Sequence, residues 1–125
     1  MRLLGIAAAI EAATGLALLA SPDLVARLLL GAEAGGTGAA LGRFAGATLA
    51  CLALASWPKT LPGGDAGFGP LALWLFQPVA VACLLFAVFG AGLQGVLLWP
   101  AIAYHAAATM LLGRVALGGR PGIGT

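Results

Sequence analysis

Four strongly polar side chains interrupt stretches of this chain that are otherwise apolar. They are Glu11, Arg43, Gln77 and His105, and each lies in a different apolar stretch. If those stretches cross a membrane, a charged residue near the middle costs at least ~2.5–3.5 kcal/mol on insertion scales and therefore seldom faces lipid. These four residues are the candidates for an intramembrane polar cluster.

Small residues accompany these polar side chains at helical spacing. Ala7, Ala8, Thr14 and Gly15 lie three or four positions from Glu11, and similar sets flank Arg43 and His105. Small residues at these offsets let helices approach closely, and Gly42 and Gly46 have the GxxxG spacing of packed membrane helices. We therefore expect Gly15, Gly42 and Gly46 to be helix-packing residues and the polar side chains to point into a bundle.

Two interpretations of Glu11 are compatible with the sequence. In one, Glu11 and Arg43 form an ion pair that allows both to lie in lipid, and His105 or Gln77 takes the remaining hydrogen bonds. In the other, the polar residues line a small cavity in which Glu11 binds a proton or a cation. The residues alone do not decide between them.

Other chemistries find little support in the sequence. The chain has a single histidine, so it cannot supply both axial ligands of a bis-histidine haem, and no metal-ligand spacing is present. Phosphate-binding loops and nucleophile motifs are also missing from the sequence. Cys51 and Cys83 lie in apolar stretches and are interpreted as packing residues. We expect no catalytic residue, no metal, no cofactor and no enzymatic activity.

The composition is typical of a membrane protein. Of the 125 residues, 62% are hydrophobic and 8% are charged, and the mean hydropathy is +1.07. Soluble domains carry roughly 25% charged residues, so this surface must face lipid. The net charge of +2 leaves no basic footprint for nucleic acid.

The order of apolar stretches predicts an all-α fold with one domain, residues 1–125. Four stretches are near the ~20 residues that span a bilayer, and unbroken apolar runs favour helices. The predicted membrane helices are residues 3–20, 38–57, 71–90 and 97–117. Pro22 and Gly31 bound a short amphipathic helix, residues 22–30, which we expect at the membrane interface. Residues 118–125 are predicted to be a flexible tail.

Basic residues and tryptophans predict the orientation. With the N-terminus in the cytoplasm, the inner side carries Arg2, Lys59, Arg114 and Arg120, and the outer side carries only Arg27. The positive-inside rule therefore places both termini in the cytoplasm. Trp57 and Trp74 near the inner interface and Trp99 near the outer one fit an aromatic belt, although tryptophans also pack inside proteins.

Two family resemblances accompany these patterns. The stretches "EAATGLALLASPDLVARLLLGAE", "GRFAGATLACLALASWP" and "LLWPAIAYHAAATMLL" resemble uncharacterised small bacterial four-helix membrane proteins, loosely similar to the DoxX group. That resemblance implies a bacterial inner-membrane protein without an assigned activity. The stretch "AAIEAATGL" and the four-helix count resemble the small multidrug resistance transporters, which implies that Glu11 would bind protons and cationic substrates. The third-helix stretch "LALWLFQPVAV" lacks the tyrosine, tryptophan and glycine pattern of those transporters.

We therefore expect a non-catalytic protein of the inner membrane. It would be an accessory or structural component that binds a lipid or another small apolar ligand within the bundle. A homo-oligomer or a larger membrane complex is compatible with this role. The alternative is a small proton-coupled transporter that uses Glu11.

Overall fold

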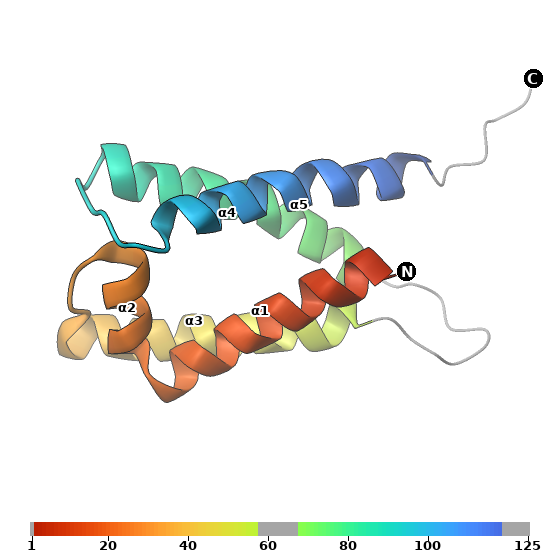
Figure 1. The fold of residues 1–125 in the computed structure, drawn as a ribbon. Helices are drawn as coiled ribbons and strands as arrows, with labels where there is room; N and C mark the ends of the chain where they lie inside the picture. Colours follow the sequence, from red (N-terminus) through yellow and green to blue (C-terminus); the bar gives the residue numbers. More distant parts are fainter. Residues whose placement is uncertain (1, 58–67, 119–125) are drawn as a thin grey trace, which may run out of the picture.

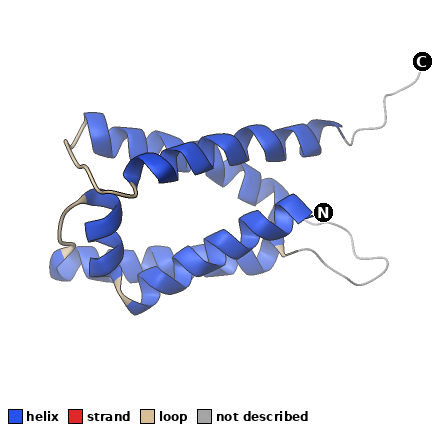
Figure 2. Ribbon diagram, viewed as in Figure 1, coloured by secondary structure: helices blue, strands red, loops and turns tan. Residues whose placement is uncertain are grey.

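The computed structural model describes residues 2–57 and 68–118. This part of the chain contains five α-helices and no strand, which confirms the all-α prediction (Figure 2). The helices are α1 (Arg2–Ala20), α2 (Pro22–Leu30), α3 (Gly35–Ser56), α4 (Gly69–Phe89) and α5 (Leu98–Gly118). Apart from Gly118, which ends α5, the predicted tail lies outside the described residues, as do Lys59 and Arg120.

Three of the described helices are long and apolar enough to cross a membrane. They are α1, α3 and α4, with hydropathies of 2.0, 1.5 and 2.3 over their most apolar windows. Helix α5 has 21 residues, as α4 does, but His105 and Arg114 make it more polar. The described helices therefore indicate a membrane protein.

The four long helices form two pairs that lie along a common direction (Figure 1). Helix α1 packs mainly on α3, and α4 packs mainly on α5. The start of α1, the end of α3, the start of α4 and the end of α5 lie at one end. Helix α2 lies across the other end, beside the connection between α4 and α5.

Two glycines set the distance between α1 and α3. A Cβ atom on Gly15 would lie 2.7 Å from the Gly46 carbonyl oxygen, and one on Gly46 would lie 2.5 Å from that of Gly15. Neither position has room for a methyl group against a backbone atom. One turn earlier in α3, a Cβ atom on Gly42 would lie 2.9 Å from the Pro22 side chain. The small residues therefore allow the backbones of α1, α2 and α3 to touch.

Helix α2 is held against the α4–α5 connection by its backbone. It begins at Pro22 and ends at Leu30, and Gly31 caps it with a φ of 68°, the left-handed conformation that closes a helix. The Leu97 amide donates a hydrogen bond of 2.8 Å to the Leu28 carbonyl. A Cβ atom on Gly31 would collide with the Gln94 carbonyl. The Ser21 side chain makes no capping bond, so Pro22 and Gly31 define this helix.

Trp74 packs between two helices and is not simply an interfacial anchor. Its indole Nε1 donates a hydrogen bond of 3.0 Å to the Thr109 carbonyl of α5. A Cβ atom on Gly113 would lie 3.1 Å from the same nitrogen. Trp57 and Trp99, in contrast, are exposed near opposite ends of the bundle. The predicted aromatic belt therefore remains a prediction for Trp57 and Trp99, while Trp74 has a packing role.

Two apolar clusters hold the ends of the bundle. Ala7, Ala8, Leu73 and Leu112 pack together near the start of α1. Val88, Leu98 and Ile102 form the second cluster, against the leucines that end α2. Glu11, Gln77 and His105 lie between the two clusters along the helices.

The close approach of α1 and α3 predicts that two glycine-to-alanine substitutions in α3 have different effects on the free energy of unfolding. Gly46→Ala should lower the free energy of unfolding by about 1–3 kcal/mol, because the new methyl group meets the Gly15 carbonyl. Gly36→Ala is the matched control, since no atom lies within 4 Å of its added Cβ. Alanine also has the higher helix propensity, so this control should be neutral or stabilising. Thermal unfolding in detergent measures both, and equal effects would contradict the packing account.

Candidate polar cluster and ligand cavity

A chain of hydrogen bonds joins three helices between the two apolar clusters. The Gln77 Nε2 amide of α4 donates to Glu11 Oε1 of α1 over 3.2 Å. The Gln77 Oε1 atom lies 2.6 Å from His105 Nδ1 of α5. Glu11 Oε1 and His105 Nδ1 are themselves 3.9 Å apart. One amide therefore bridges a carboxyl group and an imidazole that come from different helices.

This bridge is withdrawn from the surface of the protein. Gln77 has no exposed surface and Glu11 is 2% exposed. The His105 side chain is 13% exposed. The His105 backbone carbonyl also accepts a 2.7 Å hydrogen bond from the Thr109 hydroxyl. Polar groups this deeply buried are costly unless they are paired, and the Gln77 amide supplies partners to both neighbours.

The orientation of the Gln77 amide determines which nitrogen of His105 carries a proton. A carbonyl oxygen accepts hydrogen bonds and cannot donate them, so His105 Nδ1 must carry the proton that it shares with Gln77 Oε1. The opposite amide orientation would place two nitrogens 2.6 Å apart, which is shorter than a usual N–H···N contact. The distances therefore support the orientation with the amide oxygen toward His105.

Arg43 lies apart from these three residues. It is exposed on α3, and the structure gives it no ion pair with Glu11. The contact face of α3 runs through Gly42 and Gly46. Arg43 follows Gly42 directly, so its side chain points about 100° away from that face around the helix. The structure thus brings together Glu11, Gln77 and His105, and it does not form the Glu11–Arg43 pair that the sequence allowed.

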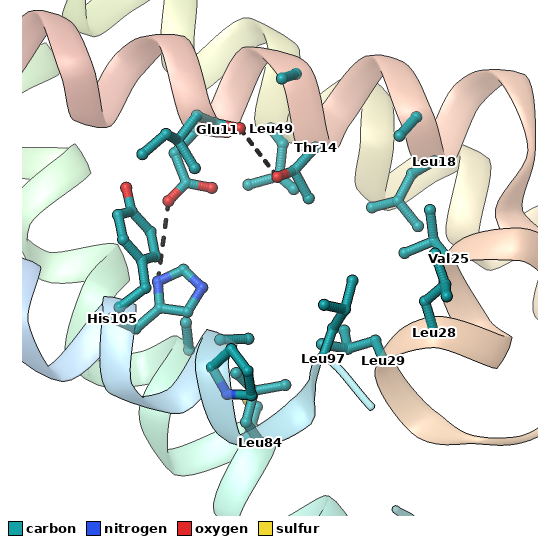
Figure 3. Close-up of a pocket in the computed structure, with 18 of the residues that line it drawn as sticks. Glu11, Thr14, Leu18, Val25, Leu28, Leu29, Leu49, Leu84, Leu97 and His105 are labelled. Carbon is teal, nitrogen blue, oxygen red and sulfur yellow. Dashed lines mark hydrogen bonds and ion pairs between the residues drawn. The ribbon is translucent and has the colours of Figure 1, made fainter. Parts of the chain in front are cut away.

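A cavity of about 690 Å³ adjoins the cluster between the two helix pairs. Figure 3 shows Glu11 and His105 on one side of it, and Leu18, Val25, Leu28 and Leu29 on the opposite side. Helices α1, α2, α4 and α5 contribute most of the lining, and Leu49 adds a contact from α3. Most of the wall is aliphatic, so the cavity suits a molecule with an apolar body.

The cavity has only a few polar atoms at its wall. Glu11 Oε1 accepts a hydrogen bond from Gln77, whereas Oε2 lies on the cavity side (Figure 3) and is not hydrogen-bonded to any described residue. The Thr14 hydroxyl is already donated to the Ile10 carbonyl over 2.9 Å. The Tyr104 hydroxyl is buried without a partner. A bound molecule would therefore meet two polar groups that still lack partners, the Glu11 carboxyl group and the Tyr104 hydroxyl.

Nothing in the described residues resembles a metal centre. They contain no group of three His, Cys, Asp or Glu side chains close enough to hold an ion. The arrangement can instead hold a hydrogen-bonding group against Glu11.

The sequence indicates Glu11, Gln77 and His105 as members of the cluster, but it wrongly includes Arg43 and does not reveal the walls of the cavity. Phe76 and Tyr104 both line it beside His105, with ring centroids 5.9 Å and 4.9 Å from the imidazole. Neighbouring residues lie about 100° apart around a helix, so the sequence position of Tyr104 beside His105 does not by itself place both at one cavity. Its position next to the only histidine was the available signal.

Comparisons of the chain with protein-family models, with curated proteins and with solved structures found no match.

The bridge predicts which pairs of substitutions are coupled. In a double-mutant cycle, Glu11→Ala and Gln77→Ala should show an interaction energy of about 0.5–3 kcal/mol, because the two side chains share a buried hydrogen bond. Glu11→Ala and Arg43→Ala should be additive within about 0.5 kcal/mol, since they share no contact. Unfolding in detergent provides both values. Coupling to Arg43 equal to that of Gln77 would refute the arrangement.

Proposed function

We propose that the protein is a non-catalytic membrane protein that binds a lipid or another small apolar ligand within its helical bundle. The observation that carries the proposal is the cavity of about 690 Å³, aliphatic over most of its wall and with a buried carboxyl group at one side. Pockets for small ligands measure roughly 300–1,000 Å³ and combine apolar walls with a few polar atoms. A ligand that dissolves in the bilayer needs such a site.

The proposal includes a bilayer arrangement with four crossings. Helix α5 would cross together with α1, α3 and α4, because it has comparable length and packs along α4. Helix α2 would lie at the interface, since it lies across one end of the bundle and its Arg27 forms an exposed ion pair with Glu33, which follows the helix. The sequence resemblance to small bacterial four-helix proteins supports placing these helices in a bacterial inner membrane.

Both termini would face the cytoplasm in this arrangement. The start of α1 and the end of α5 lie at the same end of the bundle. Arg2 and Arg114 belong to that end, and Arg27 belongs to the other. This distribution matches the positive-inside rule.

Reporter fusions test the number of crossings. A fluorescent protein fused after Thr125 should fluoresce, because cytoplasmic reporters fold there, and alkaline phosphatase inserted at Gly92 should be active outside. Alkaline phosphatase fused after Thr125 is the matched control and should be inactive. If this last fusion is active, α5 does not cross and the four-helix arrangement fails.

Arg43 supports an accessory role in a larger assembly. It is exposed on α3, a helix long and apolar enough to cross the membrane. Charged residues in membrane helices seldom face lipid and usually meet a partner. A second copy of the chain or another membrane subunit would supply that partner.

A proton-coupled transporter is the second candidate, and one observation favours it. Glu11 is a carboxyl group at the wall of a cavity within the membrane helices, which is where a transporter would bind a proton or a cation. This candidate predicts proton-linked uptake by the reconstituted protein that is lost with Glu11→Gln. The ligand-binding proposal predicts no uptake.

A bulky residue in the cavity wall should displace the ligand. Ala17 lines the cavity, so Ala17→Trp should remove a molecule that remains bound to the purified protein in native mass spectrometry. Ala47→Trp is the matched control, because Ala47 is exposed on α3 outside the cavity, and it should retain the molecule. The proposal fails if the unaltered protein retains nothing after gentle extraction, or if both variants retain the molecule equally.

A further inference from the structure

The cavity has two chemically different sides. On one side lie Glu11 and His105, together with the aromatic rings of Phe76 and Tyr104. On the other lie aliphatic side chains from α1 and α2, among them Leu18, Val25, Leu28 and Leu29. A molecule that fills the cavity therefore presents a polar group at one end and hydrocarbon at the other.

The hydrogen-bond directions restrict the polar group. Glu11 Oε2 faces the cavity without a partner, while Gln77 holds Oε1. His105 Nδ1 is committed to Gln77, and its other ring nitrogen is an acceptor when the imidazole is neutral. When Glu11 is ionised, its Oε2 beside a neutral imidazole requires a donor, and a hydroxyl group supplies one. Ethers and esters only accept hydrogen bonds and would leave the Oε2 atom of an ionised Glu11 unpaired.

The surrounding rings restrict the body next to that hydroxyl group. Phe76 and His105 meet edge to face at 79°, and Tyr104 approaches the same imidazole at 63°. Aromatic groups prefer such edge-to-face neighbours, so a planar ring at this side gains contacts that an alkyl group does not. The leucines opposite then accommodate a flexible chain.

The geometry points to an alkylphenol-type amphiphile as the ligand, with its phenolic hydroxyl donating to Glu11 Oε2 and its alkyl chain over the leucines of α2. This inference rests on the proposed function, because it names the ligand class of the same cavity. It adds a requirement for a hydroxyl donor that binding of an apolar molecule does not impose.

The native cysteines provide the test. Cys83 is exposed and lines the cavity, whereas Cys51 is exposed on α3 and does not line it. The detergent-solubilised full chain is treated with N-ethylmaleimide, and alkylation of each cysteine is followed by peptide mass spectrometry. The probes are para-octylphenol and its methyl ether, para-octylanisole, in which a methyl group replaces the donated hydrogen. Their concentration dependence gives an apparent Kd for protection of Cys83.

We expect para-octylphenol to protect Cys83 with an apparent Kd about tenfold lower than that of para-octylanisole, because a hydrogen bond to a charged group has roughly that effect. Cys51 should not be protected by either probe. Glu11→Gln should bring the two Kd values together, since an amide can donate as well as accept. Thr48→Val removes a hydroxyl bonded within α3 outside the cavity, and this control should preserve the tenfold preference.

The remaining outcomes separate the two proposals. Equal protection of Cys83 by both probes would overturn the phenol inference and leave ligand binding in place. If neither probe protects Cys83, both proposals fail. Protection of Cys51 to the same extent would show partition into the micelle and would overturn the inference as well. The comparison of the two probes uses the unaltered protein, so it stands even if Glu11→Gln does not fold.

Discussion

A carboxyl group removed from water needs a hydrogen-bond donor, and in this protein a single amide supplies it. Gln77 can donate from nitrogen and accept on oxygen at the same time, so it satisfies Glu11 and the proton on His105 Nδ1 together. A carboxylate in its place could only accept, and an apolar residue could do neither. Because the three side chains come from α1, α4 and α5, the bridge also joins the two helix pairs in their middle.

The helices themselves follow directly from the sequence. Long apolar stretches must satisfy their own backbone groups in lipid, so each becomes a helix, and the lengths of those stretches set the helix lengths. The short α2 coincides with residues 22–30 because Pro22 fits a first turn and Gly31 accepts a positive φ. Helix α3 begins at Gly35, three residues before the predicted start, because small and polar residues can extend a helix beyond its apolar stretch.

The orientation of individual side chains was harder to predict. Arg43 has small neighbours on more than one side of its helix, so spacing alone did not show which side meets α1; the contacts of Gly46 decide it. Trp74 lies near a helix end, where a belt is expected, yet a carbonyl on α5 lies within reach of its indole. Both outcomes depend on how the helices are rotated and paired, which a hydropathy pattern does not record.

The cavity also depends on how the helices are rotated and paired. Its walls combine residues from all five helices, and α2 closes one side because the backbones of Gly31 and Gly95 allow it to rest on the α4–α5 connection. A pattern within one helix cannot reveal a space enclosed by several. The sequence could therefore predict that Glu11 needs partners, but not that one of its oxygens would face open space.

The two oxygens of Glu11 bear on why the carboxyl group is present at all. If its purpose were only to strengthen the bundle, both oxygens should be paired, because an unpaired polar atom beside an apolar wall costs free energy. Gln77 satisfies Oε1, and nothing in the described residues satisfies Oε2. Local departures from full pairing are expected where a protein binds something. The stabilising and the binding interpretations of Glu11 are therefore compatible, since each concerns a different oxygen of the same side chain.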